Sequence, residues 1–226
     1  MTTEDITGTR RRQVGLGQAL AEFVRHPSPW MMASIVVGAL VARIVVGDWR
    51  VSDLWAPLAF VAVFPIIEWV IHVFVLHWRP RRVGRITLDT LLARKHRAHH
   101  ADPRNIALVF IPLQVLIVSL TVALVGFWVL LPTPQLAFTT MATSFWMLLT
   151  YEWTHYLIHS PYRPQTRFYR YIWRAHRLHH YRNERYWFGV TVHVADHVLR
   201  TFPEKDAVPV SPTARTLGVT EVPAAG

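Results

Sequence analysis

Four long apolar runs are the feature that most constrains the fold of this chain. A helix rises about 1.5 Å per residue, so roughly 20 apolar residues are enough to cross a hydrocarbon core about 30 Å thick. The runs cover residues 30–47, 54–77, 106–131 and 135–158. We therefore expect an all-α integral membrane protein with four transmembrane helices. The alternative, buried core helices of a soluble protein, is disfavoured by runs of this length.

Positive charge is concentrated in the segments between alternate runs. The formal net charge is +10, and Lys and Arg gather in residues 1–29, 78–105 and 161–226, whereas the turns at 48–53 and 132–134 have little positive charge. By the positive-inside rule, both termini and the long middle loop face the cytoplasm. The marked excess of Arg over Lys suggests a bacterial cell membrane. Because the charge lies beside the apolar runs and not on a separate domain, we expect no nucleic-acid partner.

The same patterns divide the chain into three parts. Residues 1–29 form a polar, basic segment on the cytoplasmic side, and residues 30–201 form the membrane domain. Residues 202–226 contain several prolines and little apolar periodicity, so we expect a flexible tail without chemistry. The chain has no cysteine, so any metal would be held by His, Asp or Glu.

Ten of the 13 histidines form four motifs, and all ten fall on the cytoplasmic side of this topology. Two H-x-x-H-H motifs follow the second and fourth runs, and positions i, i+3 and i+4 share one face of a helix. The candidate metal ligands are His72, His77, His96, His99, His100, His155, His159, His176, His179 and His180. His72 and His77 lie about 140° apart on an ideal helix, so they converge only if the helix ends or bends there.

This set of histidines predicts a transition-metal centre. Neutral nitrogen ligands suit iron, zinc, copper or nickel, and ten are too many for a structural zinc site, which closes at four. Two ions would have about five imidazoles each, which leaves an open octahedral position where iron could activate O2. A Glu-Trp segment with two histidines precedes each triplet, at residues 68–77 and 152–159. The two halves therefore either supply one ion each or jointly enclose a pair.

The ordered motifs resemble those of the integral-membrane fatty acid hydroxylase / sterol desaturase superfamily, and they are most similar to fatty acid 2-hydroxylases. The motifs read HVFVLH, HRAHH, HYLIH and HRLHH, followed by FGVTVHVADHVLRT at residues 188–201. The resemblance covers residues 55–201. It implies a four-helix membrane base, a cytosolic helical cap and, between them, a centre of two iron ions held by the ten histidines. Zinc is an alternative occupant of the purified protein.

The resemblance also implies an activity and partners. Such a protein hydroxylates a lipid acyl chain with O2 as co-substrate and two electrons. We expect a separate ferredoxin- or cytochrome b5-like donor with its reductase, because the 29-residue N-terminal stretch is too short for the fused cytochrome b5 domain of many eukaryotic members. A sterol or carotenoid hydroxylase or desaturase would use the same ligands. A non-enzymatic metal or haem carrier would instead need ligands deep in the bilayer.

Five further polar residues are expected near the ligands. They are Asp196, Glu152, Glu68, His193 and His197. Asp196 is expected to accept a hydrogen bond from a ligand N–H, and His193 and His197 flank it, so they could orient ligands or add to the site. Glu152 has a Glu-x-x-His spacing that soluble di-iron bundles use. Because carboxylates are few here, we expect Glu152 and Glu68 to hydrogen-bond ligands or other groups within the membrane.

Overall fold

The computed structural model describes residues 3–4, 10–11 and 13–219. Helices dominate this part of the chain, as the apolar runs predict. The α-helices are α1 (Leu16–Phe23), α2 (Pro27–Val46), α3 (Trp55–Val70), α4 (Leu91–Ala101), α5 (Leu113–Leu130), α6 (Pro134–His159), α7 (Arg167–Tyr181) and α8 (Val194–Val198). The shorter helical turns are η1 (Val51–Leu54), η3 (Ile106–Leu108) and η4 (Lys205–Ala207), all 3₁₀, and the π-helical η2 (Ile71–Leu76).

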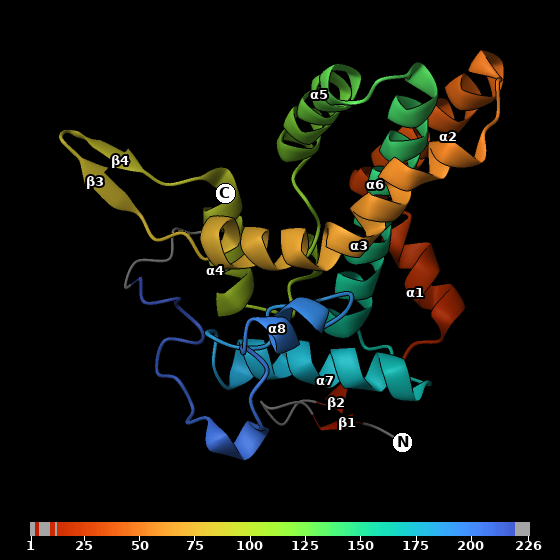
Figure 1. Ribbon diagram of the computed structural model, residues 1–226. Coiled ribbons are helices and arrows are strands. Elements are labelled where there is room, and N and C mark those ends of the chain that lie inside the picture. The colour runs from red at the N-terminus through yellow and green to blue at the C-terminus, as the bar shows by residue number, and fades with distance from the viewer. Residues whose placement is uncertain (1–2, 5–9, 12, 220–226) are drawn as a thin grey trace.

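Two short antiparallel hairpins are additions to the expected all-α fold. One pairs β1 (Thr3–Glu4) with β2 (Arg10–Arg11), and the other pairs β3 (Arg81–Val83) with β4 (Ile86–Leu88). The β3–β4 hairpin projects from the helices (Figure 1), and its turn contains Gly84 at φ +60°, a left-handed conformation that glycine adopts readily. Strands of two or three residues are too short for an alternating pattern to reveal them.

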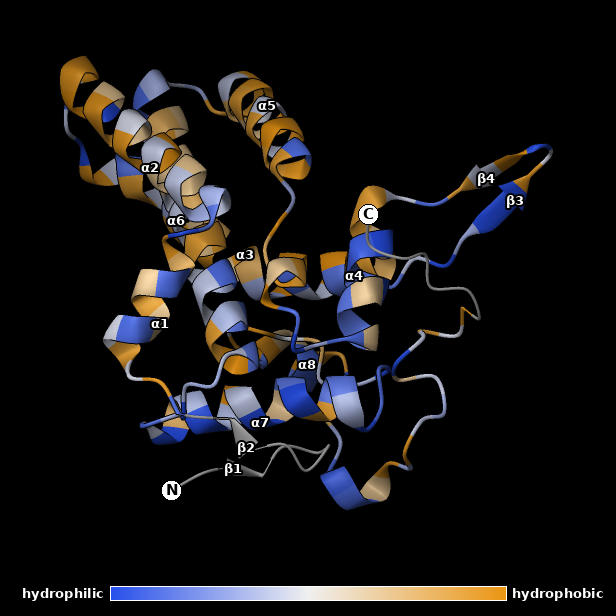
Figure 2. Ribbon diagram, turned by 180° about the vertical axis from the view of Figure 1, so that it is seen from behind, coloured by the Kyte–Doolittle hydropathy of each residue, from blue (hydrophilic) through white to orange (hydrophobic). Residues whose placement is uncertain are grey.

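The apolar helices α2 and α5 gather with much of α6 at one end of the molecule (Figure 1), and Figure 2 colours many of their residues as hydrophobic. Three segments are long and apolar enough to cross a membrane: Pro27–Val46, Val51–Leu76 and Ile106–Leu130. On α5, Val122, Val129 and Leu130 are 66%, 74% and 78% exposed. Large apolar side chains directed outward along a whole helix indicate contact with lipid.

The fourth expected span corresponds to α6, the longest helix, which does not reach the same level of apolarity. The physical reason is its position, because α6 packs against α2, α3 and α5 and many of its side chains are buried. A helix shielded from lipid by its neighbours can carry more Thr, Ser and His. Three candidate spans are therefore found by length and composition where the sequence predicted four.

Helices α2 and α6 pack closely through small and medium-sized side chains. Their shared core includes Met32, Val36, Ala39, Met141, Ala142 and Phe145. Small residues such as Ala39 and Ala142 allow two helix backbones to approach each other. At the far end of α2, the guanidinium of Arg43 is buried and binds the Asp53 carboxylate at 2.6 Å, so this charge is neutralised within the apolar region.

The polar part of the molecule lies at the opposite end, where α7, α8 and the C-terminal segment meet the end of α6 (Figure 1). The N-terminal segment contributes α1, whose Phe23 packs edge-on against Trp153 of α6 with ring centroids 4.9 Å apart. This layer and α4 hold the histidine triplets beneath the apolar helices.

The C-terminal segment differs from the expected flexible tail over residues 202–219. Val208, Ala214 and Leu217 are buried, and the Arg182 Nε donates to the Val208 carbonyl at 2.8 Å. The Thr213 hydroxyl donates to Glu184 Oε1 at 2.6 Å. These buried residues are spaced irregularly, so no helical or strand period marks them in the sequence. The rest of the expected tail, residues 220–226, lies outside the described residues.

Candidate metal centre

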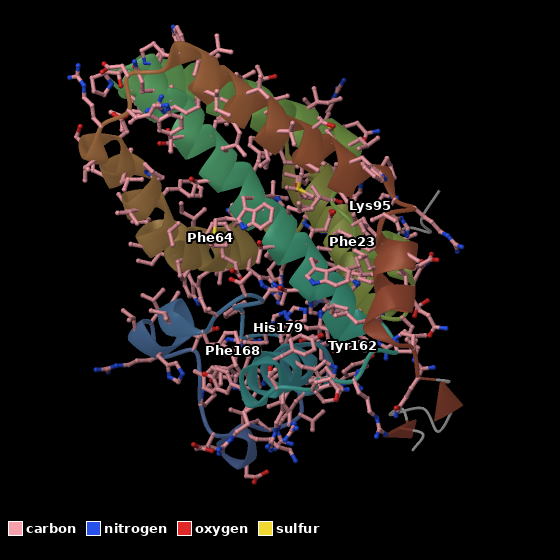
Figure 3. All side chains as sticks on the ribbon, turned by 90° about the vertical axis from the view of Figure 1, so that its right-hand side faces the viewer. Phe23, Phe64, Lys95, Tyr162, Phe168 and His179 are labelled. Carbon is pink, nitrogen blue, oxygen red and sulfur yellow. The ribbon has the colours of Figure 1, made fainter. Side chains whose placement is uncertain are left out.

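The two histidine triplets lie on helices α4 and α7, which begin with the same type of cap. The Thr90 hydroxyl accepts a hydrogen bond from the Ala93 N–H, and the Thr166 hydroxyl accepts one from the Tyr169 N–H. Such caps satisfy backbone donors that a helix start leaves unpaired. The caps thus set where each helix begins. In Figure 3, the labelled His179 lies between the long helices and α7.

All ten motif histidines come together, and they form two groups of five. The first group is His72, His77, His96, His100 and His179. The second group is His99, His155, His159, His176 and His180. Within each group one nitrogen from every ring lies within 4.8 Å of the others, so each group could hold a metal ion.

A π-helical turn brings His72 and His77 together. The turn η2 continues α3, and the His77 N–H donates to the His72 carbonyl, five residues back, at 3.1 Å. The two rings, about 140° apart on an ideal α-helix, then lie with centroids 5.0 Å apart. Single π-turns within α-helices often occur at functional sites. The bend that the sequence required is therefore present as a change of helix type.

Each H-x-x-H-H triplet is divided between the two groups. On an ideal helix, His96 and His100 lie about 40° apart, whereas His99 lies about 60° to the other side of His96. His96 and His100 accordingly join the first group, while His99 joins the second. On α7, His176 and His180 join the second group and His179 the first. The two halves of the chain thus jointly enclose both sites.

The spacing of ring nitrogens fits metal ligation. The Nε2 atoms of His96 and His100 are 3.1 Å apart, those of His99 and His159 are 3.2 Å apart, and those of His176 and His180 are 3.0 Å apart. Two nitrogens at right angles around an ion, each bound at about 2.1 Å, are separated by about 3 Å. The pairs therefore match neighbouring ligands of one ion.

Several histidines leave one buried nitrogen without a partner. His72 Nε2, His77 Nε2 and His179 Nε2 have no hydrogen bond within the described residues. A buried polar atom without a partner costs free energy, and such atoms are rare in folded proteins. Orphaned nitrogens directed into an all-imidazole cluster are explained by a transition metal, which suits this donor set.

Backbone carbonyls orient three rings of the first group. His72 Nδ1 lies 2.6 Å from the Phe188 oxygen, His179 Nδ1 lies 2.8 Å from the Tyr186 oxygen, and His100 Nδ1 lies 2.9 Å from the Ala214 oxygen. When Nδ1–H donates to a carbonyl, Nε2 keeps a free lone pair, which is the tautomer a metal requires. Sequence reasoning missed these three residues, because a carbonyl acceptor has no side-chain signature.

Burial keeps these imidazoles neutral. Burial lowers the pKa of His96, His99 and His176 well below the usual value, and neighbouring histidines lower it further. Burial also lowers the pKa of His100, to about 3. Only a neutral imidazole has a lone pair for a metal, so the surroundings favour the ligand form.

Asp196 has a different role from the expected one. Its carboxylate accepts hydrogen bonds from the backbone N–H groups of Phe188 and Gly189 at 3.0 and 2.7 Å, and from His193 Nδ1 at 2.8 Å. Among the described residues, no motif histidine donates to it. Burial alone would raise its pKa, but the hydrogen bonds from His193, Thr201 and Gly189 lower the pKa below the usual value. Asp196 therefore positions the loop whose carbonyl orients His72.

Glu68 holds the next part of the same loop. Its carboxylate accepts hydrogen bonds from the backbone N–H groups of Val190 and Thr191, the latter at 3.1 Å, and from the Thr191 hydroxyl. Gly189 lies between the two carboxylate anchors, where an added Cβ would meet the Val192 carbonyl oxygen at 2.3 Å. The loop at 188–191 is thus built to one conformation.

The three other expected neighbours lie outside the two groups. Glu152 accepts hydrogen bonds from the Ser28 hydroxyl at 2.9 Å and from the Ile111 N–H at 2.7 Å, so it joins α2, α6 and the segment before α5. His193 binds Asp196, and His197 Nε2 lies 2.8 Å from the Tyr171 hydroxyl. These residues brace the surrounding structure and do not extend either ligand group.

Two cavities lie along the helical segment, α3 and η2, that carries His72 and His77. One, of about 330 Å³, is lined by His77 together with Trp69, Arg79 and Phe188. His77 is also less buried than the other members of its group. The second, of about 150 Å³, is almost entirely apolar and lies between α3, α5 and α6, with Ser119 in its wall. An apolar cavity that opens among lipid-facing helices suits a hydrocarbon chain.

Apolar helices above two histidine groups define a membrane protein with a candidate histidine metal centre. Residues 57–201 match the family model described as fatty acid hydroxylase, and the chain belongs to the fatty acid hydroxylase family. This confirms the family that the motif order predicted.

Two plant proteins are similar to this chain. Over 147 residues it is 28% identical to a dihydroceramide fatty acyl 2-hydroxylase, FAH2, from Arabidopsis thaliana. The alignment covers 63% of this chain and 58% of the relative. Over 159 residues it is 28% identical to a second dihydroceramide fatty acyl 2-hydroxylase, FAH1, from the same organism. This alignment covers 67% of this chain and 62% of the relative. The chain therefore spans less than two thirds of the length of either relative.

A solved structure has the same fold. It is described as "Full length scs7p (only hydroxylase domain visible)" and superposes with a TM-score of 0.67, over 81% of this chain and 68% of that chain. At 21% identity, the likeness concerns the fold alone.

Proposed function

We propose that this protein is a membrane di-iron oxygenase that hydroxylates the acyl chain of a lipid with O2 and two electrons. The observation that carries the proposal is the arrangement of ten histidines, nine of them buried, in two groups of five, together with an apolar cavity along the helical segment that carries His72 and His77. Membership of the fatty acid hydroxylase family supports it. The relatives named as fatty acyl 2-hydroxylases favour carbon 2 of the chain as the position oxidised.

Iron is the metal that the donor set and the proposed chemistry favour together. Five imidazoles per group leave one octahedral position open, whereas a structural zinc site closes at four ligands. Bound iron would supply the redox chemistry that activates O2 and removes a hydrogen from an unactivated carbon. Zinc can replace iron in a nitrogen site, so a purified sample that contains zinc would be expected to be inactive.

The chain's own residues would bind the substrate and keep the site dry. The apolar cavity walls contributed by Phe64, Ile67 and Leu148 suit an alkyl chain. Glu68 and Asp196 fix the loop at 188–191, which contacts His72 of the first group. Burial of the ligands excludes water, which limits side reactions of an oxidant. The overall reaction, R–H + O2 + 2 e⁻ + 2 H⁺ giving R–OH + H2O, needs an external electron donor.

We further propose that α6 is a fourth membrane span and that the histidines face the cytoplasm. Its 26 residues are long enough to cross, and several of its polar residues, such as Thr140 and Glu152, are buried against other parts of the chain. The excess of Arg and Lys outside the apolar runs supports the cytoplasmic orientation of the termini and the metal centre. A bacterial cell membrane stays a prediction, since the named relatives are plant proteins.

Lipid analysis of an expression host tests the proposed function. Cells that produce the protein are expected to accumulate a hydroxylated acyl lipid, and isotopically heavy O2 should label the new hydroxyl. His176→Ala should abolish the product, whereas His26→Ala should not, because His26 stacks on Phe110 away from both groups. A new double bond instead of a hydroxyl would indicate desaturation, and an unchanged lipid profile with iron-loaded protein would contradict the proposal.

A further inference from the structure

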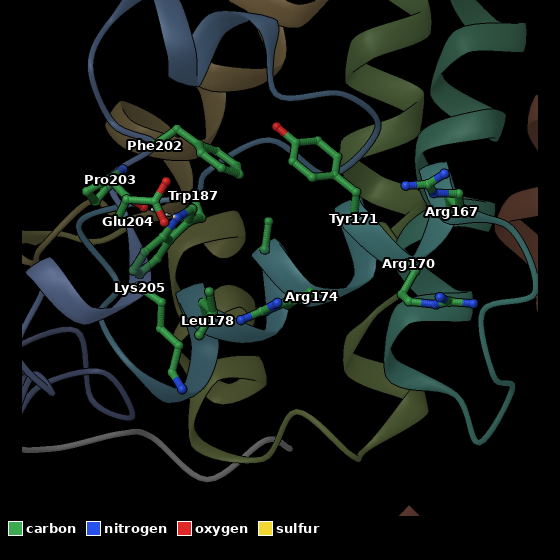
Figure 4. Close-up of a pocket in the computed structure, with 11 residues that line it drawn as sticks. Arg167, Arg170, Tyr171, Arg174, Leu178, Trp187, Phe202, Pro203, Glu204 and Lys205 are labelled. Atoms are coloured by element: carbon green, nitrogen blue, oxygen red, sulfur yellow. Dashed lines mark hydrogen bonds between the residues drawn. The ribbon is translucent and has the colours of Figure 1, made fainter.

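A groove runs along the outer face of α7, on the side away from its three histidines. It has a volume of about 390 Å³, and Figure 4 shows the side chains that line it. Arg167, Arg170 and Arg174 contribute one wall, and they are three and four residues apart, so they share one helix face. Glu204 and Lys205 belong to the segment opposite.

The cationic groups of this groove have no partner in the described part of the chain. The side chains of Arg167, Arg170 and Arg174 are exposed and make no hydrogen bond or ion pair there. Some arginines elsewhere are neutralised, as Arg97 is by Asp89 at 2.5 Å. Four cations against one acid, Glu204, give the groove a positive potential that attracts an acidic surface.

The base of the groove is connected to the histidine groups. Trp187 lines the groove and is almost fully buried, and its neighbours in sequence supply the carbonyls that accept from the histidines. The Tyr186 carbonyl oxygen accepts a hydrogen bond from His179 Nδ1 at 2.8 Å, and the Phe188 carbonyl oxygen accepts one from His72 Nδ1 at 2.6 Å. One short loop therefore runs from the groove to two rings of the first group.

The position of the groove favours a soluble protein, and not a membrane lipid, as its partner. In Figure 1, α7 lies at the opposite end of the molecule from the apolar helices α2 and α5, and Figure 2 shows mostly hydrophilic residues along α7. A bilayer that surrounds α2 and α5 does not reach this outer face. The surface is open to a protein in the aqueous phase.

We propose that this groove docks the acidic face of a small soluble electron-transfer protein, with Arg167, Arg170 and Arg174 as its main contacts. The inference rests on the proposed function, because the oxidation consumes two electrons that the chain does not supply. A reduced iron–sulfur or haem protein would deliver them in two one-electron steps and leave oxidised each time. Charge complementarity would set the rate of docking and make it sensitive to salt.

Direct binding measurements test the groove independently of activity. The probes are an acidic [2Fe–2S] ferredoxin and the soluble haem domain of a cytochrome b5, each titrated onto the metal-loaded protein at low and high salt. R170E/R174E should weaken binding by about tenfold or more and remove most of the salt dependence. The matched control is R81E/R82E, which reverses two arginines on the projecting β3–β4 hairpin and should bind as the wild type does.

Failure of the docking proposal and failure of the proposed function give different results. With a small chemical reductant, R170E/R174E should hydroxylate lipid as the wild type does, because no protein needs to dock. If even the wild type makes no product with that reductant, the proposed function fails, while the binding data still judge the groove. Equal affinity of R170E/R174E and wild type, loss of binding only in R81E/R82E, or no salt-sensitive binding of either probe would overturn the docking proposal.

Discussion

His99 and His179 are exchanged between the two halves of the chain. His99 belongs to the first triplet but lies with His155 and His159, its Nε2 3.2 Å from that of His159. His179 belongs to the second triplet but lies with His72 and His77, and the ring centroids of His179 and His72 are 4.6 Å apart. Each site is thus completed by the middle histidine of the other half, so neither half builds a site alone.

The division of α7 between the groups predicts separable losses of metal. His176 and His179 are one helical turn apart but belong to different groups. After dialysis against a chelator, His176→Ala and His179→Ala should each retain about one ion per chain, and the double variant should retain none. Elemental analysis measures this. Retention of two ions by both single variants would show that the groups are not the ligand sets.

The conformation of the loop at 188–191 predicts a severe effect of a single methyl group. In Gly189→Ala the new Cβ would meet the Val192 carbonyl oxygen at 2.3 Å, so the loop must shift. We expect a loss of about 1–3 kcal/mol in unfolding free energy, seen as a lower melting temperature. Gly38→Ala is the control, because nothing lies within 4 Å of its added Cβ. Equal melting temperatures of the two variants would contradict the tight fit.

The C-terminal segment is expected to be necessary for the first histidine group. Truncation after residue 204 removes Ala214, whose carbonyl oxygen lies 2.9 Å from His100 Nδ1. Loss of such an orienting partner typically weakens metal binding about 10- to 100-fold. Truncation after residue 219 keeps that contact and serves as the control. If both truncated proteins bind metal equally well, Ala214 has no such role.

The apolar cavity predicts a change in chain-length preference. Ser119 lines this cavity, and Ser119→Phe should fill much of its volume of about 150 Å³. We expect poorer turnover of long acyl chains, with shorter chains affected less, as measured by lipid mass spectrometry. Val122→Phe lies on the same helix but faces outward, 66% exposed, and should change nothing. The same chain-length profile in both variants would exclude this cavity as the acyl site.

The sequence predicted the ten histidines that come together, because their spacing and their positions beside apolar runs can be read directly from the sequence. It left open whether the halves act separately or jointly, since the answer depends on how α4 and α7 are rotated against each other. Likewise, Asp196 was predicted as a partner of a ligand ring but binds the backbone of Phe188 and Gly189. Contacts through backbone atoms have no counterpart in a residue pattern.

Longer-range packing explains the remaining differences. The tail was expected to be flexible because Val208, Ala214 and Leu217 follow no period, yet each is buried against the rest of the protein. The π-turn at His72 was anticipated only as a bend, because the geometry of two rings required one. Its form depends on the helix boundary and could not be predicted from spacing alone.

The most direct measurement is anomalous X-ray scattering at the iron absorption edge from the iron-loaded protein. We expect two iron peaks, one among His72, His77, His96, His100 and His179, and the other among His99, His155, His159, His176 and His180. A single peak in an active protein, or two peaks outside these nitrogens, would contradict a di-iron centre shared between the two halves of the chain.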